Sequence, residues 1–178
     1  MNIRKHIPNS ITLGNMYCGF LSMGFTVHHY YRSAAALILI GMLLDALDGR
    51  VARRLNVKSE IGKQLDSLAD IVTFGIAPTI LFAYTNAIEG GMLDFVLTGL
   101  FILCGGYRLA RFNVDTSEDL SHFSGVPITA AGGLLAFSTL FHAHISAIGN
   151  IVIICILSYL MVSTWKIPSF KTSIISKQ

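Results

Sequence analysis

The chain has 178 residues, of which 53% are hydrophobic and only 13% are charged. Soluble domains carry about 25% charged residues, so this composition argues against a soluble protein and indicates a membrane protein with no nucleic-acid partner. The net charge of +3 says little by itself, because the positions of the charges matter more. A chain of this length without a linker or low-complexity stretch is expected to form one domain.

Apolar stretches predict membrane-spanning helices, each of which needs about 20 apolar residues. Residues 11–31 carry no charged side chain and form the first expected span. Residues 33–44 are too short alone and continue into the charged segment 45–54. We read them as a second span whose polar end lines a cavity, because charges exposed to lipid are costly. Residues 71–88 form the third span.

The second half repeats this pattern. Residues 95–107 run into Arg108 and Arg111, so another polar helix end should face a cavity. Residues 120–165 carry no charged side chain and are long enough for two spans, with a turn at 142–150. We therefore expect an all-α integral membrane bundle of six transmembrane helices, at about residues 8–30, 33–54, 60–86, 93–112, 126–146 and 148–165.

Lysines and arginines set the expected orientation. Of the 13 in the chain, only Arg32 falls on one side of this arrangement, and the others, from Arg4 to Lys177, fall on the opposite side. Basic residues collect in cytoplasmic loops, so both termini and the polar helix ends should face the cytosol. The expected location is the cell inner membrane. The residues expected at the other side are interfacial or surface residues: His28, His29, Tyr30, Tyr31, His142 and His144.

Small residues and one proline within the spans are expected to serve packing. Pro78 should kink the third helix, with Gly75 nearby. Gly132 and Gly133 favour close contact between helices. The cysteines lie far apart in apolar stretches and are expected to be buried without disulfides: Cys18, Cys104 and Cys155.

Four aspartates form the most informative pattern. Asp45 and Asp48 are three residues apart, and Asp66 and Asp70 are four apart, so each pair shares one helix face. The segment 54–61 is long enough for a tight turn, which makes the second and third helices antiparallel. Both carboxylate pairs can then converge at the cytosolic end of the bundle.

Carboxylates that converge at membrane depth need a positive counter-charge. Each aspartate costs about 2.5–3.5 kcal/mol near the centre of a spanning helix, and like charges repel. Bound divalent cations remove both costs, and oxygen ligands favour Mg²⁺ or Mn²⁺. The alternative is a set of solvated carboxylates paired with Arg50, Arg53, Arg54 and Lys63. It leaves the spacing unexplained, as well as the small residues Gly49, Ala52 and Gly62, which make room for a ligand.

Residues 45–70 match at every position the signature of the CDP-alcohol phosphatidyltransferases, D-x2-D-G-x2-A-R-x8-G-x3-D-x3-D. The expected six-helix layout is also similar to that family, so the resemblance covers the whole chain. It implies that residues 1–178 form a single transmembrane catalytic domain, which moves a phosphatidyl group from a CDP-activated lipid to an alcohol. It also implies a homodimer with a polar cavity facing the cytosol.

The resemblance also implies roles for individual residues. Asp45, Asp48 and Asp66 would be metal ligands of a two-metal Mg²⁺ or Mn²⁺ site, and Asp70 would be both a ligand and the general base. The residues that would hold the CDP moiety are Asn9, Gly49, Ala52, Arg53 and Gly62. We expect direct attack on the lipid-side phosphorus with CMP as the leaving group.

Two further segments point to the acceptor. Residues 107–113 (YRLARFN) and 123–128 (FSGVPI) resemble the phosphatidylserine synthase branch of that family, as do 74–78, 158–163 and 168–171. This branch implies CDP-diacylglycerol and L-serine as substrates. Arg108 and Arg111 could then bind the serine carboxylate and a donor phosphate, and Asn113 could orient either group. Alternatively, both arginines extend to the interface without binding substrate.

The sequence leaves three other functions open. Glycerol 3-phosphate or inositol phosphate could replace serine as the acceptor. A divalent-cation transporter would use the carboxylates as an ion path, but it gives no role to Gly49, Arg53 or Gly62. A non-catalytic scaffold gives no role to four converging aspartates.

Overall fold

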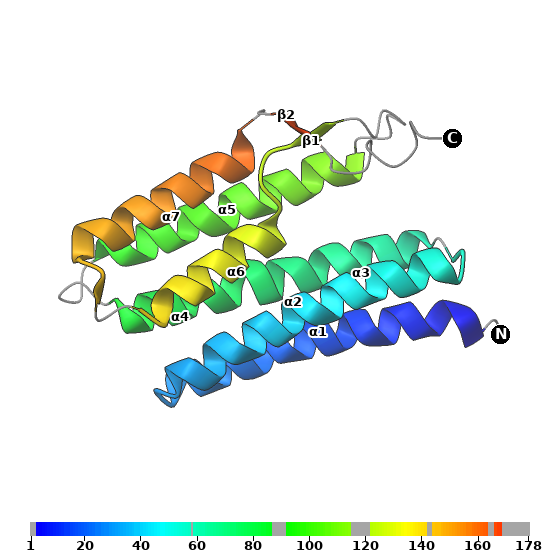
Figure 1. The fold of residues 1–178 in the computed structure, drawn as a ribbon, viewed down its shortest axis with the longest axis horizontal. Helices are drawn as coiled ribbons and strands as arrows, with labels where there is room; N and C mark the ends of the chain where they lie inside the picture. Colours follow the sequence, from blue (N-terminus) through cyan, green and yellow to red (C-terminus); the bar gives the residue numbers. More distant parts are fainter. Residues whose placement is uncertain are drawn as a thin grey trace, which may run out of the picture.

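A computed structural model describes residues 3–57, 59–86, 92–114, 122–141, 144–163 and 166–168. These residues form an elongated bundle of six helices (Figure 1). The elements are α1 (Ile3–Val27), α2 (Tyr31–Arg54), a continuous third helix made of α3 (Glu60–Asp70), η1 (Ile71–Ile76) and α4 (Ala77–Thr85), then α5 (Met92–Val114), β1 (His122–Ser124), α6 (Ile128–Thr139), α7 (Ala147–Val162) and β2 (Lys166–Pro168).

The six-helix prediction is confirmed, but the lengths differ. The third helix and α5 run close to their expected bounds. The fifth helix was expected over 126–146, and α6 covers only Ile128–Thr139. By length and composition, Glu60–Thr85 and Phe95–Val114 can each cross a membrane, whereas Ile128–Thr139 and Ile148–Val162 are apolar but shorter.

The outer surface of the bundle is apolar. Large side chains such as Phe20, Phe95, Leu103 and Tyr159 are more than 60% exposed. Soluble monomers rarely expose contiguous apolar surface on this scale, whereas lipid covers it in a membrane. The interior is filled by smaller apolar residues of α2 and by larger ones that include Phe74, Phe101, Ile128 and Leu135. Composition and exposure together therefore support a membrane protein.

Helices α1 and α2 pack closely because small residues lie between them and η1. A Cβ on Gly41 would lie 2.8 Å from Asn15 Oδ1, and a Cβ on Gly19 would lie 2.8 Å from the Cα of Thr73. The Thr73 hydroxyl donates to the backbone oxygen of Asn15 at 3.0 Å. Figure 1 shows α1 and α2 side by side along their length. This packing fixes the orientation of α2, and therefore the direction of the face that carries Asp45 and Asp48.

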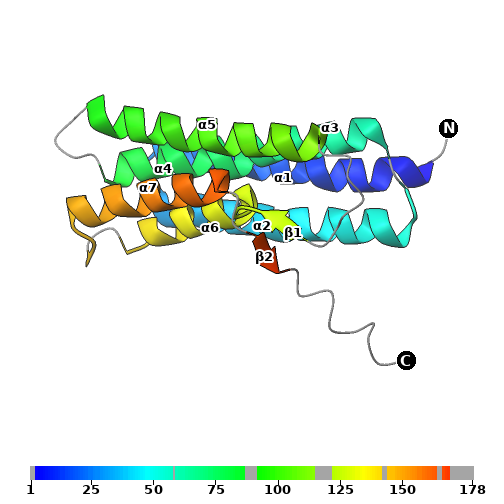
Figure 2. The same cartoon turned by 90° about the horizontal axis from the view of Figure 1, so that it is seen from above.

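The third helix changes geometry next to the aspartates. Residues Ile71–Ile76 form a π-helical segment that begins directly after Asp70. Pro78 follows, and it has no backbone N–H to donate to the Phe74 carbonyl. A Cβ on Gly132 of α6 would overlap this carbonyl, so the close packing predicted for Gly132 is confirmed. Seen from above (Figure 2), α5 runs along one edge of the bundle, and α2 and α6 run along the other.

A short strand pair accompanies the helices and was not predicted from the sequence. Strands β1 and β2 are antiparallel, with His122 opposite Pro168. Gly125 follows β1 with a φ of +77°, and its α-carbon faces the Met161 carbonyl closely enough that a Cβ would lie 2.6 Å away. The Val126 N–H donates to the Leu160 carbonyl at 3.1 Å. The chain entering α6 is therefore tied to the end of α7.

Candidate active site

The turn between α2 and α3 brings the two halves of the aspartate pattern together. The Val57 N–H donates to the Ala52 carbonyl at 3.0 Å, and Asn56 adopts a left-handed φ of +50°. Ser59 then caps α3, because its hydroxyl accepts from the Gly62 N–H at 3.4 Å. The chain reverses within these few residues, so α2 and α3 are antiparallel as predicted.

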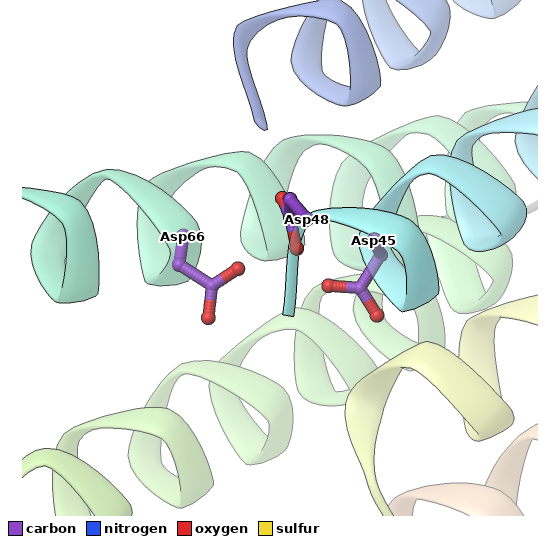
Figure 3. A group of neighbouring side chains, drawn as sticks. All are labelled: Asp45, Asp48 and Asp66. Carbon is purple, nitrogen blue, oxygen red and sulfur yellow. The ribbon is translucent and has the colours of Figure 1, made fainter. Parts of the chain in front are cut away.

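Three carboxylates converge beside this turn. Each of Asp45, Asp48 and Asp66 offers one oxygen, and these oxygens lie within 4.8 Å of one another. Figure 3 shows the carboxylates of Asp45 and Asp48 from α2 and of Asp66 from α3 turned toward one shared space. Three anionic oxygens at this spacing fit a hard divalent cation such as Mg²⁺ or Mn²⁺. The cluster can therefore hold a metal ion.

Neighbouring hydroxyls orient two of these carboxylates. The Thr12 hydroxyl of α1 donates to Asp48 Oδ2 at 2.6 Å, in a buried contact. Thr129, in the first turn of α6, makes a side-chain hydrogen bond to Asp45. Each hydroxyl leaves its carboxylate with further lone pairs for a metal ion. Helices α1 and α6 thus act as supports for the two ligands on α2.

A cavity of about 560 Å³ opens beside the three carboxylates and extends to the ends of α1, α2 and α3. All five residues expected to hold the CDP moiety line it: Asn9, Gly49, Ala52, Arg53 and Gly62. A Cβ on Gly62 would lie 3.1 Å from Asn9 Oδ1, whereas a Cβ on Gly49 would meet nothing closer than Arg53 Nη2 at 4.0 Å. Gly62 therefore makes room for Asn9, and Gly49 keeps open space beside Arg53.

Comparison with known proteins agrees with this geometry. The family model for CDP-alcohol phosphatidyltransferase matches residues 5–165. The chain belongs to the CDP-alcohol phosphatidyltransferase family. The matched range includes every residue of the carboxylate cluster and of the cavity lining.

Curated relatives cover most of the chain. It is 44% identical to the CDP-diacylglycerol–serine O-phosphatidyltransferase of Bacillus subtilis, over 94% of this chain and 92% of the relative. It is 34% identical to the enzyme of the same name from Helicobacter pylori, over 92% of this chain and 72% of the relative. It is also 34% identical to the archaetidylserine synthase of Methanothermobacter thermautotrophicus, over 91% of this chain and 69% of the relative.

Asp70 is the fourth aspartate of the signature and is buried near the other three. It is only 8% exposed, and its Oδ1 atom has no hydrogen-bond partner among the described residues. The group of three oxygens within 4.8 Å does not include it. Asp70 interacts electrostatically with Asp45, Asp66 and Asp48, and to a smaller extent with Arg108 of α5. Arg108 is also 8% exposed, and its Nε has no partner among the described residues. Asp70 is therefore a buried neighbour of both the carboxylate cluster and a buried cation, and its role as a metal ligand stays a prediction.

The α5 residues expected to bind the acceptor lie outside the cavity lining, which comes from α1, α2, α3 and the turn between α2 and α3. Arg108 is buried, and Arg111 is partly exposed. The Asn113 side-chain amide donates to Ser67 Oγ at 2.8 Å. Asn113 therefore links α5 to α3, and its proposed contact with a substrate group stays a prediction.

Sequence reasoning missed several residues that shape the site. Thr12 follows Asn9 by three residues on the same helix face, so its contact with Asp48 could have been inferred from the spacing. Nothing in one sequence indicates that Thr129 and Ser67 contribute to the site, and Lys63 was considered only as a possible partner of the carboxylates. Asn15, one turn beyond Thr12, is fully buried with both side-chain polar atoms unpartnered among the described residues.

Proposed function

We propose that this chain transfers the phosphatidyl group of CDP-diacylglycerol to the hydroxyl of L-serine, giving phosphatidylserine and CMP. The observation that carries the proposal is the convergence of Asp45, Asp48 and Asp66 on the wall of the cavity, at the positions of the family signature. Relatives whose names specify serine and CDP-diacylglycerol support the choice of substrates.

The donor occupies the cavity at the end of α1, α2 and α3. Asn9, Gly49, Ala52, Arg53 and Gly62 hold its CDP moiety, since all of them line this space. Arg53 supplies a guanidinium that can donate two parallel hydrogen bonds to a phosphate. Open space beside Gly49 lets the nucleotide approach the backbone of α2.

Asp45, Asp48 and Asp66 would hold Mg²⁺ or Mn²⁺, and Asp70 would complete a two-metal site. Two divalent ions, when bound, neutralise charge on the phosphoryl oxygens and on the leaving phosphate. Thr12 and Thr129 keep the ligands on α2 in place through their hydrogen bonds to Asp48 and Asp45.

Asp70 acts as the general base. A serine hydroxyl is a weak nucleophile, so a nearby carboxylate must take its proton. Asp70 Oδ1 has no partner among the described residues and can accept that proton. The serine oxygen then bonds to the lipid-side phosphorus, the bond from this phosphorus to the bridging oxygen breaks, and CMP leaves with that oxygen. No covalent intermediate with the protein is needed.

Arg108 and Arg111 bind the carboxylate of serine and a phosphate of the donor, and Asn113 helps to orient them. The buried, unpartnered Nε of Arg108 supports this assignment. Exchanging Arg111 for Ala is expected to raise the Michaelis constant for serine. An unchanged constant would show that Arg111 does not bind the acceptor.

The protein acts as a homodimer in a cell inner membrane, with six spanning helices. Both termini and the active site face the cytosol, because the basic residues gather at that end. The mass of the protein–detergent complex, measured by light scattering, tests the dimer. Accessibility of single cysteines introduced at either end of the bundle tests the orientation.

The decisive experiment measures CMP release by the purified protein in detergent, with CDP-diacylglycerol and Mn²⁺ or Mg²⁺. Each candidate acceptor is offered in turn. Release that requires both a metal and L-serine supports the proposal. Release with glycerol 3-phosphate or inositol phosphate instead would support phosphatidyl transfer but show that serine is not the acceptor. If no acceptor yields CMP, the enzyme proposal fails, and cation flux into liposomes becomes the next measurement.

A further inference from the structure

We propose that Lys63 binds a phosphate of the donor nucleotide and that a contact between α3 and α5 holds it in position. Lys63 directly follows Gly62 and lines the same cavity as Arg53 and Asp66. The inference rests on the proposed function, since it assumes that this cavity takes the CDP moiety.

A closed set of three hydrogen bonds fixes the Lys63 side chain. Its Nζ donates to the backbone oxygen of Asn113 at 2.9 Å. The Asn113 side-chain amide donates to Ser67 Oγ at 2.8 Å, and Ser67 Oγ donates to the Lys63 backbone oxygen at 3.3 Å. Because Lys63 and Ser67 are one turn apart on α3, this set, which we call the α3–α5 clamp, joins that turn to the end of α5.

The clamp uses only part of the hydrogen-bonding capacity of Lys63. An ammonium group has three N–H donors, and the Asn113 carbonyl takes one. This carbonyl lies in the last turn of α5, where the helix dipole favours a cation. The contact therefore holds the ammonium in place without neutralising it, although Glu60 and Asp66 line the same cavity. Two donors and the full charge stay available to a ligand.

The charge balance of the cavity indicates what that ligand is. Among the described residues, Arg53 and Lys63 are the basic side chains that line it, one from α2 and one from α3. A diphosphate carries anionic oxygens on two phosphorus atoms, and a metal at the aspartate cluster neutralises only part of this charge. Arg53 and Lys63 together supply two positive charges from different helices, which suits two adjacent phosphates.

Binding of soluble nucleotides tests the assignment without an acceptor or a lipid surface. The dissociation constants of CDP and cytidine are measured by calorimetry with the full chain in detergent and Mn²⁺. A charge-assisted hydrogen bond contributes about 1.5–3 kcal/mol, so Lys63→Met should weaken CDP binding by roughly 10- to 100-fold. Cytidine, which has no phosphate, should bind the variant as it binds the natural protein.

Three further variants sharpen the test. Arg54→Met removes a positive charge from the exposed end of α2, outside the cavity lining, and should leave CDP affinity unchanged. Lys63→Arg should recover part of it. Ser67→Ala breaks the clamp but keeps Lys63, so it should weaken CDP binding by only about 2- to 5-fold, as expected for one neutral hydrogen bond. Ser67→Ala and Lys63→Arg also carry the test if Lys63→Met does not fold.

Each outcome separates this inference from the proposed function. If Lys63→Met weakens CDP and cytidine equally, Lys63 serves only to join the helices, and the inference is wrong. The same holds if CDP affinity does not change. If the natural protein itself binds no CDP in the presence of metal, the proposed donor site fails, and the assignment of Lys63 fails with it.

Discussion

Buried polar side chains differ between the two ends of the helix bundle. Away from the aspartates, they bond to one another or to the backbone: Ser22 Oγ donates to the Ala34 carbonyl at 2.9 Å, and Asn150 Nδ2 donates to Asn86 Oδ1 at 2.6 Å. At the aspartate end, Asp70 Oδ1 and Arg108 Nε are buried without partners among the described residues, as are both polar side-chain atoms of Asn15, one turn beyond Thr12. Unpartnered buried groups are costly and rare in folded proteins, so these groups support the proposal of a ligand site at this end.

The cavities at the two ends differ in the same way. The one at the far end, about 460 Å³, is lined by aromatic, histidine and small polar residues together with Leu140 and a single cation, Arg32. There, His29 Nδ1 lies 2.8 Å from the Tyr31 hydroxyl. The one at the aspartate end is lined by four carboxylates and two cations. The far-end residues suit a membrane interface, whereas the aspartate end has the charges that a metal and a diphosphate need.

Removal of the metal should give the largest effect. Chelation is expected to reduce CMP release to background, because the clustered carboxylates then repel one another and the phosphates. Added Mn²⁺ should restore activity and stabilise the fold, by about 2.7 kcal/mol at a concentration 100 times the dissociation constant. Melting temperatures in detergent measure this gain. Asp66→Asn should abolish it, and a gain that persists in Asp66→Asn would place the metal elsewhere.

Exchange of Asp70 for Asn should give the next largest effect. The amide keeps the shape of the side chain but takes no proton, so the turnover number should fall by about 10²- to 10⁴-fold. CDP affinity, measured by calorimetry in saturating Mn²⁺, should fall much less than the turnover number, since Asp70 does not line the cavity. Activity within tenfold of the natural protein would exclude Asp70 as the base.

The sequence predicted the aspartate end better than the rest of the fold. Spacing on a helix face placed Asp45 with Asp48, and the length of the turn brought Asp66 to them. These are local relations, which one sequence contains. Asp70 was grouped with them on the same reasoning, and its role as a ligand stays a prediction. The π-helical segment directly after it, which packs against Gly132 of α6, was not predicted. A regular helical pattern does not contain that information.

Contacts between distant segments were not predicted from the sequence. The hydrogen bonds of Lys63 and Ser67 to Asn113 join positions that lie 46–50 residues apart. The pairing of β1 with β2 likewise joins segments on either side of two helices. No periodicity within one segment encodes such contacts. The length of α6 was overestimated for a different reason. Apolar composition continues past Thr139, whereas the helix ends there.

A smaller effect is expected from Gly132→Ala, which tests the packing behind the π-helical segment. The new Cβ would overlap the Phe74 carbonyl, and overpacking of this kind costs about 1–3 kcal/mol. The melting temperature should therefore fall. Gly99→Ala is the matched control, because a Cβ at Gly99 of α5 would meet nothing within 4 Å. Equal melting temperatures for the two variants would contradict the close contact between α6 and η1.

The smallest effect should come from the far end. Asn150→Ala removes the hydrogen bond to Asn86, and such bonds between membrane helices contribute about 0.6 kcal/mol on average. Melting temperatures of Asn150→Ala, Asn86→Ala and the double variant give the coupling between the two side chains. The Michaelis constants for both substrates should stay unchanged, because neither Asn150 nor Asn86 lines the cavity at the aspartate end. A severalfold change in either constant would mean that the far end also communicates with the site, and the contrast between the two ends would no longer hold.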